Sequence, residues 1–327
     1  MAEIDELHDA FGRRLNYVRI SVTDRCNFRC RYCMPPEGVK CLSHSDILRY
    51  EDIKFLCGVL SEMGVGKFRF TGGEPLVRKG LVPFLKDLRN EMPSVKITLT
   101  TNASLLDEYA SGLAESGIDS LNISLDTLDP AKFAEVTRIG SLEKVLSGIE
   151  AARSAGIENI KLNAVLVRGF NDKEIPEMLS YARKNALLLR LIEFMPLQES
   201  VWKKDSFISG EEILASLPCG EAWEKIEAIG NDDGPAQYYF NRESGDKIGI
   251  ITAVSNHFCQ KCNRLRISAE GKLRTCLFSN EETALKSIIQ ERDASALKAE
   301  IIRSAGNKPR RWKDINKGNL QMSGIGG

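Results

Sequence analysis

The sequence predicts an α/β fold built as a partial (β/α)6 barrel with a C-terminal extension. Short runs rich in Val, Ile, Phe or Thr alternate with longer stretches in which apolar residues recur every three or four positions. Strands that alternate with helices in this way form a parallel sheet with the helices outside. Six strand runs are fewer than the eight of a closed barrel, so we expect an open sheet. The runs span residues 17–22, 67–71, 96–100, 120–124, 161–165 and 189–194.

Helical patterns fill the intervals between these runs. Apolar residues with helical spacing follow the first run and recur before the fifth; they are Ile53, Leu56, Val59, Leu60 and Met63, then Leu142, Val145, Leu146 and Ile149. Ser45 or Asp46 can cap the first helix, and Asp129 with Pro130 opens another. Helices are expected to end at glycines, namely Gly64, Gly117 and Gly156. Because the strands are parallel, the functional face should lie at their carboxyl ends.

The regular alternation stops after residue 196, which divides the chain into a barrel core, 1–196, and a C-terminal region, 197–327. In the C-terminal region, residues 211–217 and 281–291 have helical patterns. Residues 231–235 form a turn cluster of Asn, Asp, Gly and Pro. This region therefore has a less regular architecture than the barrel.

The overall charge is balanced. Of the 327 residues, 45 are Lys or Arg and 45 are Asp or Glu, so the formal net charge is zero. This balance argues against nucleic acids and membrane surfaces as partners attracted by bulk charge. The sequence contains no run of 18 apolar residues, and its acidic first residues do not form a signal peptide, so we expect a cytoplasmic protein. An anionic ligand would need a local cluster of Arg and Lys.

The chain contains nine cysteines, and this odd number without a secretion signal argues against a disulfide framework. Six of them fall into two triplets. The first triplet, Cys26, Cys30 and Cys33, directly follows the first strand run. Three thiolates are one short of a closed structural zinc site. On a cubane iron–sulfur cluster they leave one iron open, which can bind the amino and carboxylate groups of a methionine.

This first triplet resembles that of the radical S-adenosylmethionine superfamily, and Tyr32 occupies the aromatic position before its last cysteine. The resemblance implies a [4Fe–4S] cluster and an S-adenosylmethionine that is cleaved to a 5′-deoxyadenosyl radical. Glycines at the end of the second strand permit close backbone approach, and Glu74 can meet a cationic amino group. The implied S-adenosylmethionine contacts are Tyr32, Gly72, Gly73, Glu74, Ser124 and Met195.

The second triplet consists of Cys259, Cys262 and Cys276. Its spacing alone leaves open a zinc site completed by His257. The whole segment 256–266 is more specific, and it resembles the C-terminal cluster region of the molybdenum cofactor biosynthesis protein A family, the GTP 3′,8-cyclases. Segments that resemble the same family elsewhere are residues 19–35, 192–196 and 326–327. The resemblance therefore covers nearly the whole chain.

This second resemblance implies a second [4Fe–4S] cluster, whose open iron orients the guanine of a bound GTP. The adenosyl radical would take the hydrogen at C3′, and the sugar radical would attack C8 to give a 3′,8-cyclised nucleotide, the first step of molybdopterin synthesis. Orientation would decide which hydrogen is taken. The implied GTP contacts are Arg19, Arg69, Thr100, Lys161, Arg264, Leu265 and Arg266. The implied catalytic residues are Arg264, Arg266, Gly326 and Gly327.

The residues alone leave some of these assignments open. Arg69 lies between two phenylalanines in a strand run and could instead face solvent by simple alternation. Ala103 departs from the family, which often has glycine there. The three remaining cysteines match no ligand position, although Cys57 fits a helix core; they are Cys41, Cys57 and Cys219.

The family resemblance also implies partners. They are an electron donor of the flavodoxin or ferredoxin type and, functionally, the downstream cyclic pyranopterin monophosphate synthase. The resemblance allows a homodimer and requires neither nucleic acid nor membrane. Two alternative functions are a peptide-modifying radical enzyme, which would generally carry more C-terminal cysteines, and a non-catalytic zinc-binding protein.

Overall fold

The computed structural model describes residues 6–197, 202–227 and 234–315. Its N-terminal part alternates strands with helices. The strands are β1 (Tyr17–Ser21), β2 (Lys67–Thr71), β3 (Lys96–Thr101), β4 (Ser120–Ser124), β5 (Ile160–Leu166) and β6 (Leu188–Glu193). The helices are α1 (Tyr50–Glu62), α2 (Leu81–Glu91), α3 (Leu106–Glu115), α4 (Pro130–Thr137), α5 (Leu142–Ser154) and α6 (Ile175–Lys184). The six strand runs and the alternation predicted from the sequence are confirmed.

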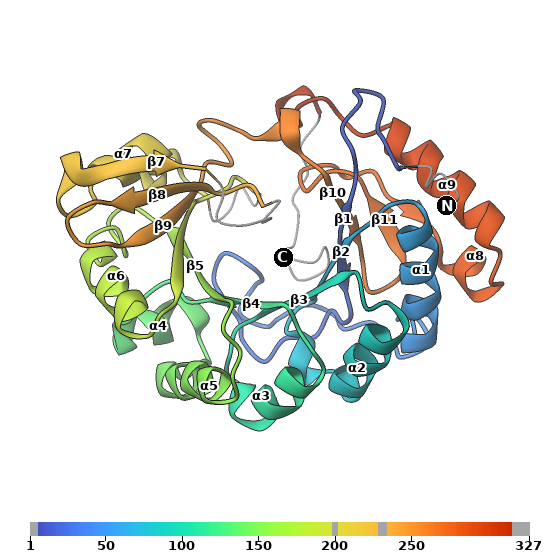
Figure 1. Cartoon of the computed structure of the whole chain (residues 1–327), viewed down its shortest axis with the longest axis horizontal. Coiled ribbons are helices and arrows are strands. Elements are labelled where there is room, and N and C mark those ends of the chain that lie inside the picture. The colour runs from blue at the N-terminus through green and yellow to red at the C-terminus, as the bar shows by residue number, and fades with distance from the viewer. Residues whose placement is uncertain (1–5, 198–201, 228–233, 316–327) are drawn as a thin grey trace.

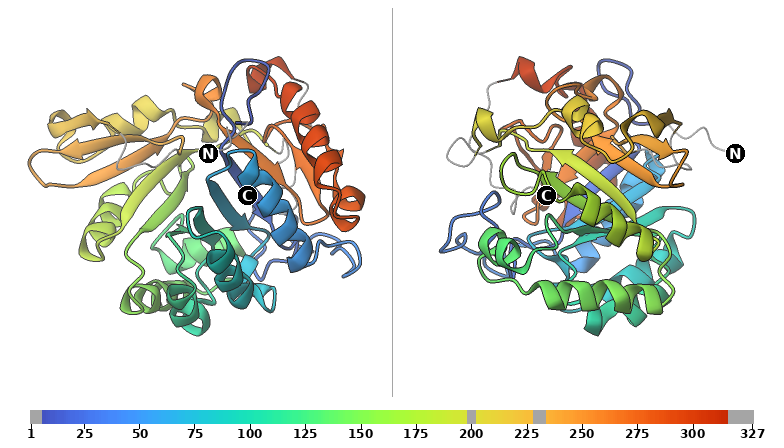
Figure 2. Two further views of the ribbon diagram at one scale, coloured as in Figure 1. Left: turned by 45° about the vertical axis from the view of Figure 1, so that its right-hand side comes forward. Right: turned by 90° about the vertical axis from the view of Figure 1, so that its left-hand side faces the viewer.

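The described C-terminal part consists of shorter elements. Its strands are β7 (Trp223–Ile226), β8 (Gln237–Asn241), β9 (Lys247–Ile251), β10 (Arg264–Ile267), β11 (Lys272–Arg274) and β12 (Thr283–Ala284). Its helices are α7 (Gly210–Ala215), α8 (Lys286–Gln290) and α9 (Ala294–Gly306). Helices α8 and α9 pack against α1, as the side view shows (Figure 2).

All the described strands belong to one open sheet, in the order β12-β11-β10-β1-β2-β3-β4-β5-β6-β9-β8-β7. Strands β1 to β6 are adjacent in chain order and parallel. The C-terminal part extends both edges of this sheet, because β10 pairs in parallel with β1 and β9 pairs in parallel with β6. Figure 1 shows the curved sheet with α1 to α6 outside it. The predicted partial barrel is thus confirmed, and the C-terminal strands continue its sheet.

The two faces of the sheet differ in chemistry. Alternate residues on each strand are apolar, face the outer helices and belong to the main core, as Val18 and Ile20 do on β1 and Phe68 and Phe70 do on β2. Most of the residues between them are polar or charged, as Arg19 is, although Val165 and Ile192 are apolar. A barrel filled with apolar side chains would have no room for a ligand. The polar inner face of this sheet therefore marks it as the wall of a binding chamber.

Local signals explain most helix boundaries. The Asp129 carboxylate accepts hydrogen bonds from the amides of Ala131 and Lys132 and caps α4, as predicted. The predicted cap of the first helix at Ser45 or Asp46 is wrong. Helix α1 begins at Tyr50, and the side chain of Asp52 accepts the Arg49 amide at 3.0 Å. Within the described ranges, the structure contains no helix long and apolar enough to cross a membrane.

Candidate active site

The inner face of the sheet lines a cavity of about 310 Å³ that both cysteine triplets reach. The cavity brings together most of the residues singled out by the sequence, from elements far apart in the chain. Those lining it are Cys26, Cys30, Cys33, Cys259, Cys262 and Cys276, with Tyr32, Gly72, Gly73, Glu74, Ser124, Met195, Arg19, Arg69, Thr100, Arg264 and Arg266. A volume of this size is typical of small-molecule sites.

One wall of the cavity is a ladder of basic side chains. Arg266, Arg19 and Arg69 are register partners across the three adjacent strands β10, β1 and β2. Two residues earlier on the same strands, Arg264 and Lys67 flank Tyr17. All of them have the same parity, so their side chains face the cavity together. Arg69 is buried, so the alternative that it faces solvent is wrong.

This wall carries a strong positive potential. Burial, together with neighbouring arginines, lowers the pKa of Arg19 to about 10 in spite of the Tyr17 phenol, and it lowers the pKa of Arg266 well below its usual range. Guanidinium groups packed so closely repel one another, and an anion between them would relieve this repulsion. A chain of zero net charge needs a local group of basic side chains to bind an anionic ligand, and this wall provides one.

The first triplet lies in the loop that follows β1. Arg29 holds this loop by donating to the carbonyl oxygens of Cys26 and Phe28, at 2.7 and 2.9 Å. Burial raises the pKa of Cys26 to about 11 and that of Cys30 well above its usual range, and negative charge on the neighbouring thiols adds to the shift at Cys30. Three soft sulfur donors that line one cavity fit a cationic iron–sulfur cluster, which would bind them as thiolates.

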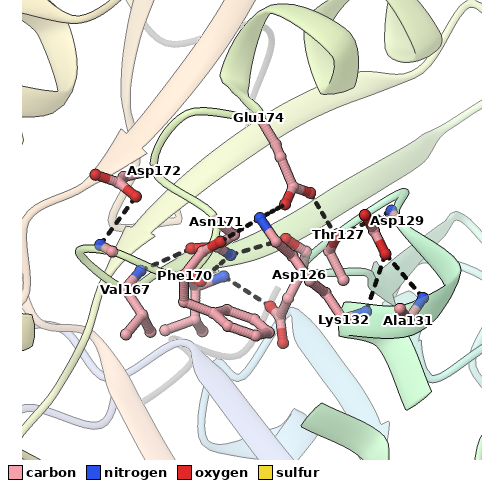
Figure 3. Close-up of polar contacts among 12 residues, drawn as sticks. Asp126, Thr127, Asp129, Ala131, Lys132, Val167, Phe170, Asn171, Asp172 and Glu174 are labelled. Carbon is pink, nitrogen blue, oxygen red and sulfur yellow. Dashed lines mark hydrogen bonds and ion pairs between the residues drawn. The ribbon is translucent and has the colours of Figure 1, made fainter. Parts of the chain in front are cut away.

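Tyr32 is anchored by a network that the sequence did not reveal. Its hydroxyl donates to the carboxylate of Asp126, which also accepts the Val165 amide at 2.8 Å. The side-chain amide of Asn171 donates to the carbonyl oxygens of Asp126 and Val165, at 2.8 and 2.9 Å. Figure 3 shows how Asn171 and Asp126 tie the loop after β5 to the loop after β4. Two elements of the barrel thereby fix the position of the aromatic ring next to the first triplet.

The glycine pair after β2 packs against the protein's own backbone. A Cβ atom on Gly72 would lie 2.5 Å from the Thr23 carbonyl oxygen, and one on Gly73 would lie 2.3 Å from that of Arg25. The Gly73 amide donates to Thr23 and the Glu74 amide to Arg25, at 2.9 and 2.8 Å. These glycines therefore let the loop after β2 lie directly on the loop that leads to the first triplet.

Glu74 has a positioning role in this structure. Its buried carboxylate accepts hydrogen bonds from the Leu76 amide, the Thr101 hydroxyl and the Asn102 amide, at 3.1, 2.8 and 2.7 Å. Burial raises its pKa to about 7 in spite of these bonds. The carboxylate thus joins the loops after β2 and β3, and its expected contact with a cationic amino group stays a prediction.

The second triplet lies beside two basic residues. Burial alone would raise the pKa of Cys262, but the charges of Arg264 and Lys308 lower it to about 6. The buried ammonium of Lys308 donates to the carbonyl oxygens of Arg264 and Thr275. A thiol stabilised as a thiolate is ready to bind metal, so Cys262 suits a cluster ligand, whereas burial raises the pKa of Cys259.

The N-terminal segment braces the second triplet from outside the cavity. Arg13 is buried, forms an ion pair with Asp9 and donates to the carbonyl oxygens of Cys259 and Pro309, each at 2.7 Å. This contact joins residues 246 positions apart in the chain. No local pattern in the sequence could have predicted it.

The geometry of the second triplet does not favour the zinc alternative. A zinc ion needs donors about 2.0–2.3 Å from one point. No three His, Cys, Asp or Glu side chains among the described residues are gathered closely enough to hold one metal ion. The His257 ring instead packs edge-on against Trp312, with 6.5 Å between the ring centres. The thiols are therefore spaced more widely than a mononuclear site requires.

Two of the predicted GTP contacts, Lys161 and Leu265, do not line this cavity. Lys161 lines a separate hollow of about 640 Å³ at the amino ends of the strands. Leu265 is fully buried in the core, on the opposite side of β10 from its two arginine neighbours. Gly326 and Gly327 lie outside the described residues. Among the other three cysteines, Cys57 is buried as predicted, whereas Cys41 and Cys219 are exposed.

The cavity also contains polar residues that the sequence reasoning missed. Strand alternation places them on the same, inward face as the predicted residues, and this alternation could have identified them. They are Tyr17, Lys67, Asn122, Asn163 and Arg190. The buried Oδ1 atom of Asn122 has no hydrogen-bond partner among the described residues. A buried amide oxygen left unpaired in a cavity wall is available to a polar ligand.

An open parallel α/β barrel with three thiols after β1 and a glycine pair after β2 defines a radical S-adenosylmethionine enzyme. Residues 20–182 match the Radical SAM superfamily, and residues 187–314 match the Molybdenum Cofactor Synthesis C family. The solved structure of Streptococcus suis SuiB bound to S-adenosylmethionine has a similar fold, with a TM-score of 0.62 and 15% identity, over 83% of this chain and 63% of that one.

Curated relatives identify the particular family. The GTP 3′,8-cyclase of Peptoclostridium acidaminophilum is 44% identical over 308 residues, which is 93% of this chain and 92% of that protein. The GTP 3′,8-cyclase of Geobacter sulfurreducens is 44% identical over 307 residues, 94% of each chain. The chain belongs to the GTP 3′,8-cyclase family.

Proposed function

We propose that this chain cyclises GTP, joining C3′ of the ribose to C8 of the guanine as the first step of molybdenum cofactor biosynthesis. One observation carries the proposal beyond family membership: two thiol triplets and a ladder of arginines line one cavity. A radical enzyme that acts on an inorganic or apolar substrate would not need such a basic wall. A nucleoside triphosphate does need it.

The first triplet would hold a [4Fe–4S] cluster on Cys26, Cys30 and Cys33. With S-adenosylmethionine bound and one electron from the reduced cluster, this site would supply the 5′-deoxyadenosyl radical that is needed to take the hydrogen from C3′. The protein supplies position. Tyr32 is fixed by Asp126, and the Gly72-Gly73 loop is fixed on the cysteine loop. Together with Glu74, Ser124 and Met195, these residues would fix the S-adenosylmethionine, so that one hydrogen of the substrate is within reach.

The basic ladder would bind the triphosphate. Arg19, Arg69 and Arg266 have planar guanidinium groups that can each form two parallel hydrogen bonds with phosphate oxygens. Thr100 and the unpaired amide oxygen of Asn122 add polar contacts for the sugar or base. The second cluster, on Cys259, Cys262 and Cys276, would orient the guanine, with Arg264 beside it. Lys161 would contact the phosphates from the amino ends of the strands, and Leu265 would contribute through its main chain.

The remaining assignments extend this proposal. Gly326 and Gly327 would enter the cavity during catalysis, because residues without side chains fit a crowded site. An electron donor of the flavodoxin or ferredoxin type would reduce the first cluster. The product would pass to a cyclic pyranopterin monophosphate synthase in the cytoplasm. Residues 1–196 would act as the barrel core and 197–327 as the region that carries the second cluster, and the enzyme would be able to form a homodimer.

The test is an anaerobic count of iron and sulfide, with turnover of GTP and S-adenosylmethionine measured in the same preparation. The proposal predicts about eight irons per chain and 5′-deoxyadenosine only when GTP is present. About four irons per chain would contradict the assignment of a second cluster. Deoxyadenosine formed equally well without GTP would contradict the proposal that GTP is the substrate.

A further inference from the structure

Tyr17 lies in the middle of the basic wall and lines the cavity with its side chain buried. Its hydroxyl oxygen accepts a hydrogen bond from Arg69 Nε at 2.6 Å. The Lys67 ammonium lies 5.0 Å from the centre of its ring, and the Arg69 guanidinium carbon lies 6.0 Å from it. The phenol is therefore held between two cations of the neighbouring strand.

The hydroxyl of Tyr17 has no acceptor for its own hydrogen among the described residues, since Arg69 can only donate. A buried tyrosine usually finds such an acceptor, whereas a phenolate needs none. Within residues 6–197, 202–227 and 234–315, the charged groups that face Tyr17 or pair with it come from β1, β2 and β10 and are basic; they are Arg19, Lys67, Arg69, Arg264 and Arg266. These surroundings favour the negatively charged form.

Burial alone would raise the pKa of Tyr17. The positive charges of Arg69, Arg19 and Lys67, with the hydrogen bond from Arg69, outweigh burial and lower this pKa to about 7. At neutral pH the phenolate and the phenol are therefore both present in the ligand-free protein. Each change of one pKa unit corresponds to a tenfold change in the ratio of the two forms.

We propose that Tyr17 is a positioning residue of the phosphate subsite, which holds Arg69 as a counter-charge in the ligand-free enzyme and gains a proton from solvent when a polyphosphate binds. This inference rests on the proposed function, in which GTP provides the polyphosphate. The incoming phosphates bring negative charge to the same cations that stabilise the phenolate. Because like charges repel, the phenolate becomes the neutral phenol, and Arg69 turns from tyrosine to phosphate.

This exchange makes substrate binding pH-dependent. Above pH 7 the ligand-free enzyme carries the phenolate, so binding requires uptake of one proton, and the affinity falls by up to tenfold for each pH unit. Below pH 7 the phenol is already neutral, so binding takes up no proton at this residue. The fall in affinity with rising pH should stop where the pH exceeds the pKa of Tyr17 in the complex.

The experiment is calorimetric titration of the anaerobic enzyme with both clusters in place and without S-adenosylmethionine, so that no turnover occurs. GTP and inorganic tripolyphosphate are each titrated at pH 6 and pH 8, in buffers with different heats of ionisation, which gives the number of protons taken up. The variant is Tyr17→Phe, which keeps the ring and removes only the hydroxyl. Tyr181→Phe on α6 is the matched control, because burial raises the pKa of Tyr181 and keeps it neutral.

The difference between wild type and Tyr17→Phe is the readout, because the terminal phosphate of either ligand titrates equally with both proteins. Relative to Tyr17→Phe, wild type and Tyr181→Phe should each take up nearly one additional proton on ligand binding at pH 8. At pH 6 the three proteins should take up the same number of protons. Equal uptake by wild type and Tyr17→Phe at pH 8 would overturn the inference. If tripolyphosphate shows the extra uptake and GTP does not bind, the inference stands and the proposed substrate is wrong. Failure of both ligands to bind overturns both.

Discussion

The contact between the glycine pair and the cysteine loop gives the sharpest prediction for a single substitution. In Gly73→Ala the new Cβ atom would lie 2.3 Å from the Arg25 carbonyl oxygen and 2.6 Å from its carbon, so one loop must move. That movement breaks the hydrogen bonds from the Gly73 amide to Thr23 and from the Glu74 amide to Arg25. Two bonds at about 1 kcal/mol each, with overpacking of about 1–3 kcal/mol, lower the free energy of unfolding by about 3–5 kcal/mol.

The matched control is Gly66→Ala, because a Cβ atom on Gly66 would meet nothing within 4 Å. Urea denaturation of the anaerobic enzymes gives the stability difference, and cleavage of S-adenosylmethionine gives the functional one. We expect Gly66→Ala to resemble the wild type in both assays, and Gly73→Ala to be less stable and to cleave S-adenosylmethionine more slowly. Wild-type stability in Gly73→Ala would refute the argument that these glycines exist for contact between the two loops.

Four further predictions follow from other parts of the structure. The Glu193 carboxylate accepts hydrogen bonds from the amides of Gly210, Val254 and Ser255, at 2.7, 2.7 and 2.9 Å. Glu193→Ala should therefore loosen the segment before the second triplet and reduce the iron content from about eight to about four per chain. Arg19→Met should weaken GTP binding by roughly tenfold, or about 1.4 kcal/mol, without changing iron content, and calorimetry with iron analysis would check both. Because the pKa of Tyr17 is lowered from 10.0 to about 7, the ligand-free wild type should gain stability over Tyr17→Phe as the pH rises from 7 to 10, and lose this advantage below pH 7; denaturation at several pH values tests the sign. Replacing Cys41 and Cys219 together by serine should leave iron content unchanged, because both are exposed and neither lines the cavity; loss of iron would contradict the assignment of the two triplets.

The barrel was predictable because its signal is local. Each strand run carries its own β-branched and aromatic residues, and each helix its own apolar spacing. The C-terminal strands were less visible because their places in the sheet depend on partners far away in sequence. Strand β10 is only four residues long and pairs with β1, which precedes it by more than two hundred residues. No local propensity specifies such a pairing.

The candidate site was predictable where a motif has a fixed spacing, as in the cysteine triplets. It was less predictable where function depends on the direction of a side chain. Leu265 was placed with its arginine neighbours, yet strand alternation turns it into the core. The same alternation would have added Tyr17 and Lys67 to Arg19 and Arg69. Asp126 could not be assigned, because its partner Tyr32 is 94 positions away and the contact exists only in the fold.

Transfer of hydrogen from the ribose can be followed directly with GTP that is labelled with deuterium at C3′. The enzyme, with its clusters, S-adenosylmethionine and a reductant, is allowed to turn over, and the 5′-deoxyadenosine is analysed by mass spectrometry. The proposed function predicts that one deuterium moves from the substrate to the deoxyadenosine and that the nucleotide product is cyclised. Unlabelled deoxyadenosine formed alongside cyclised product, or labelled deoxyadenosine without cyclisation, would contradict the account.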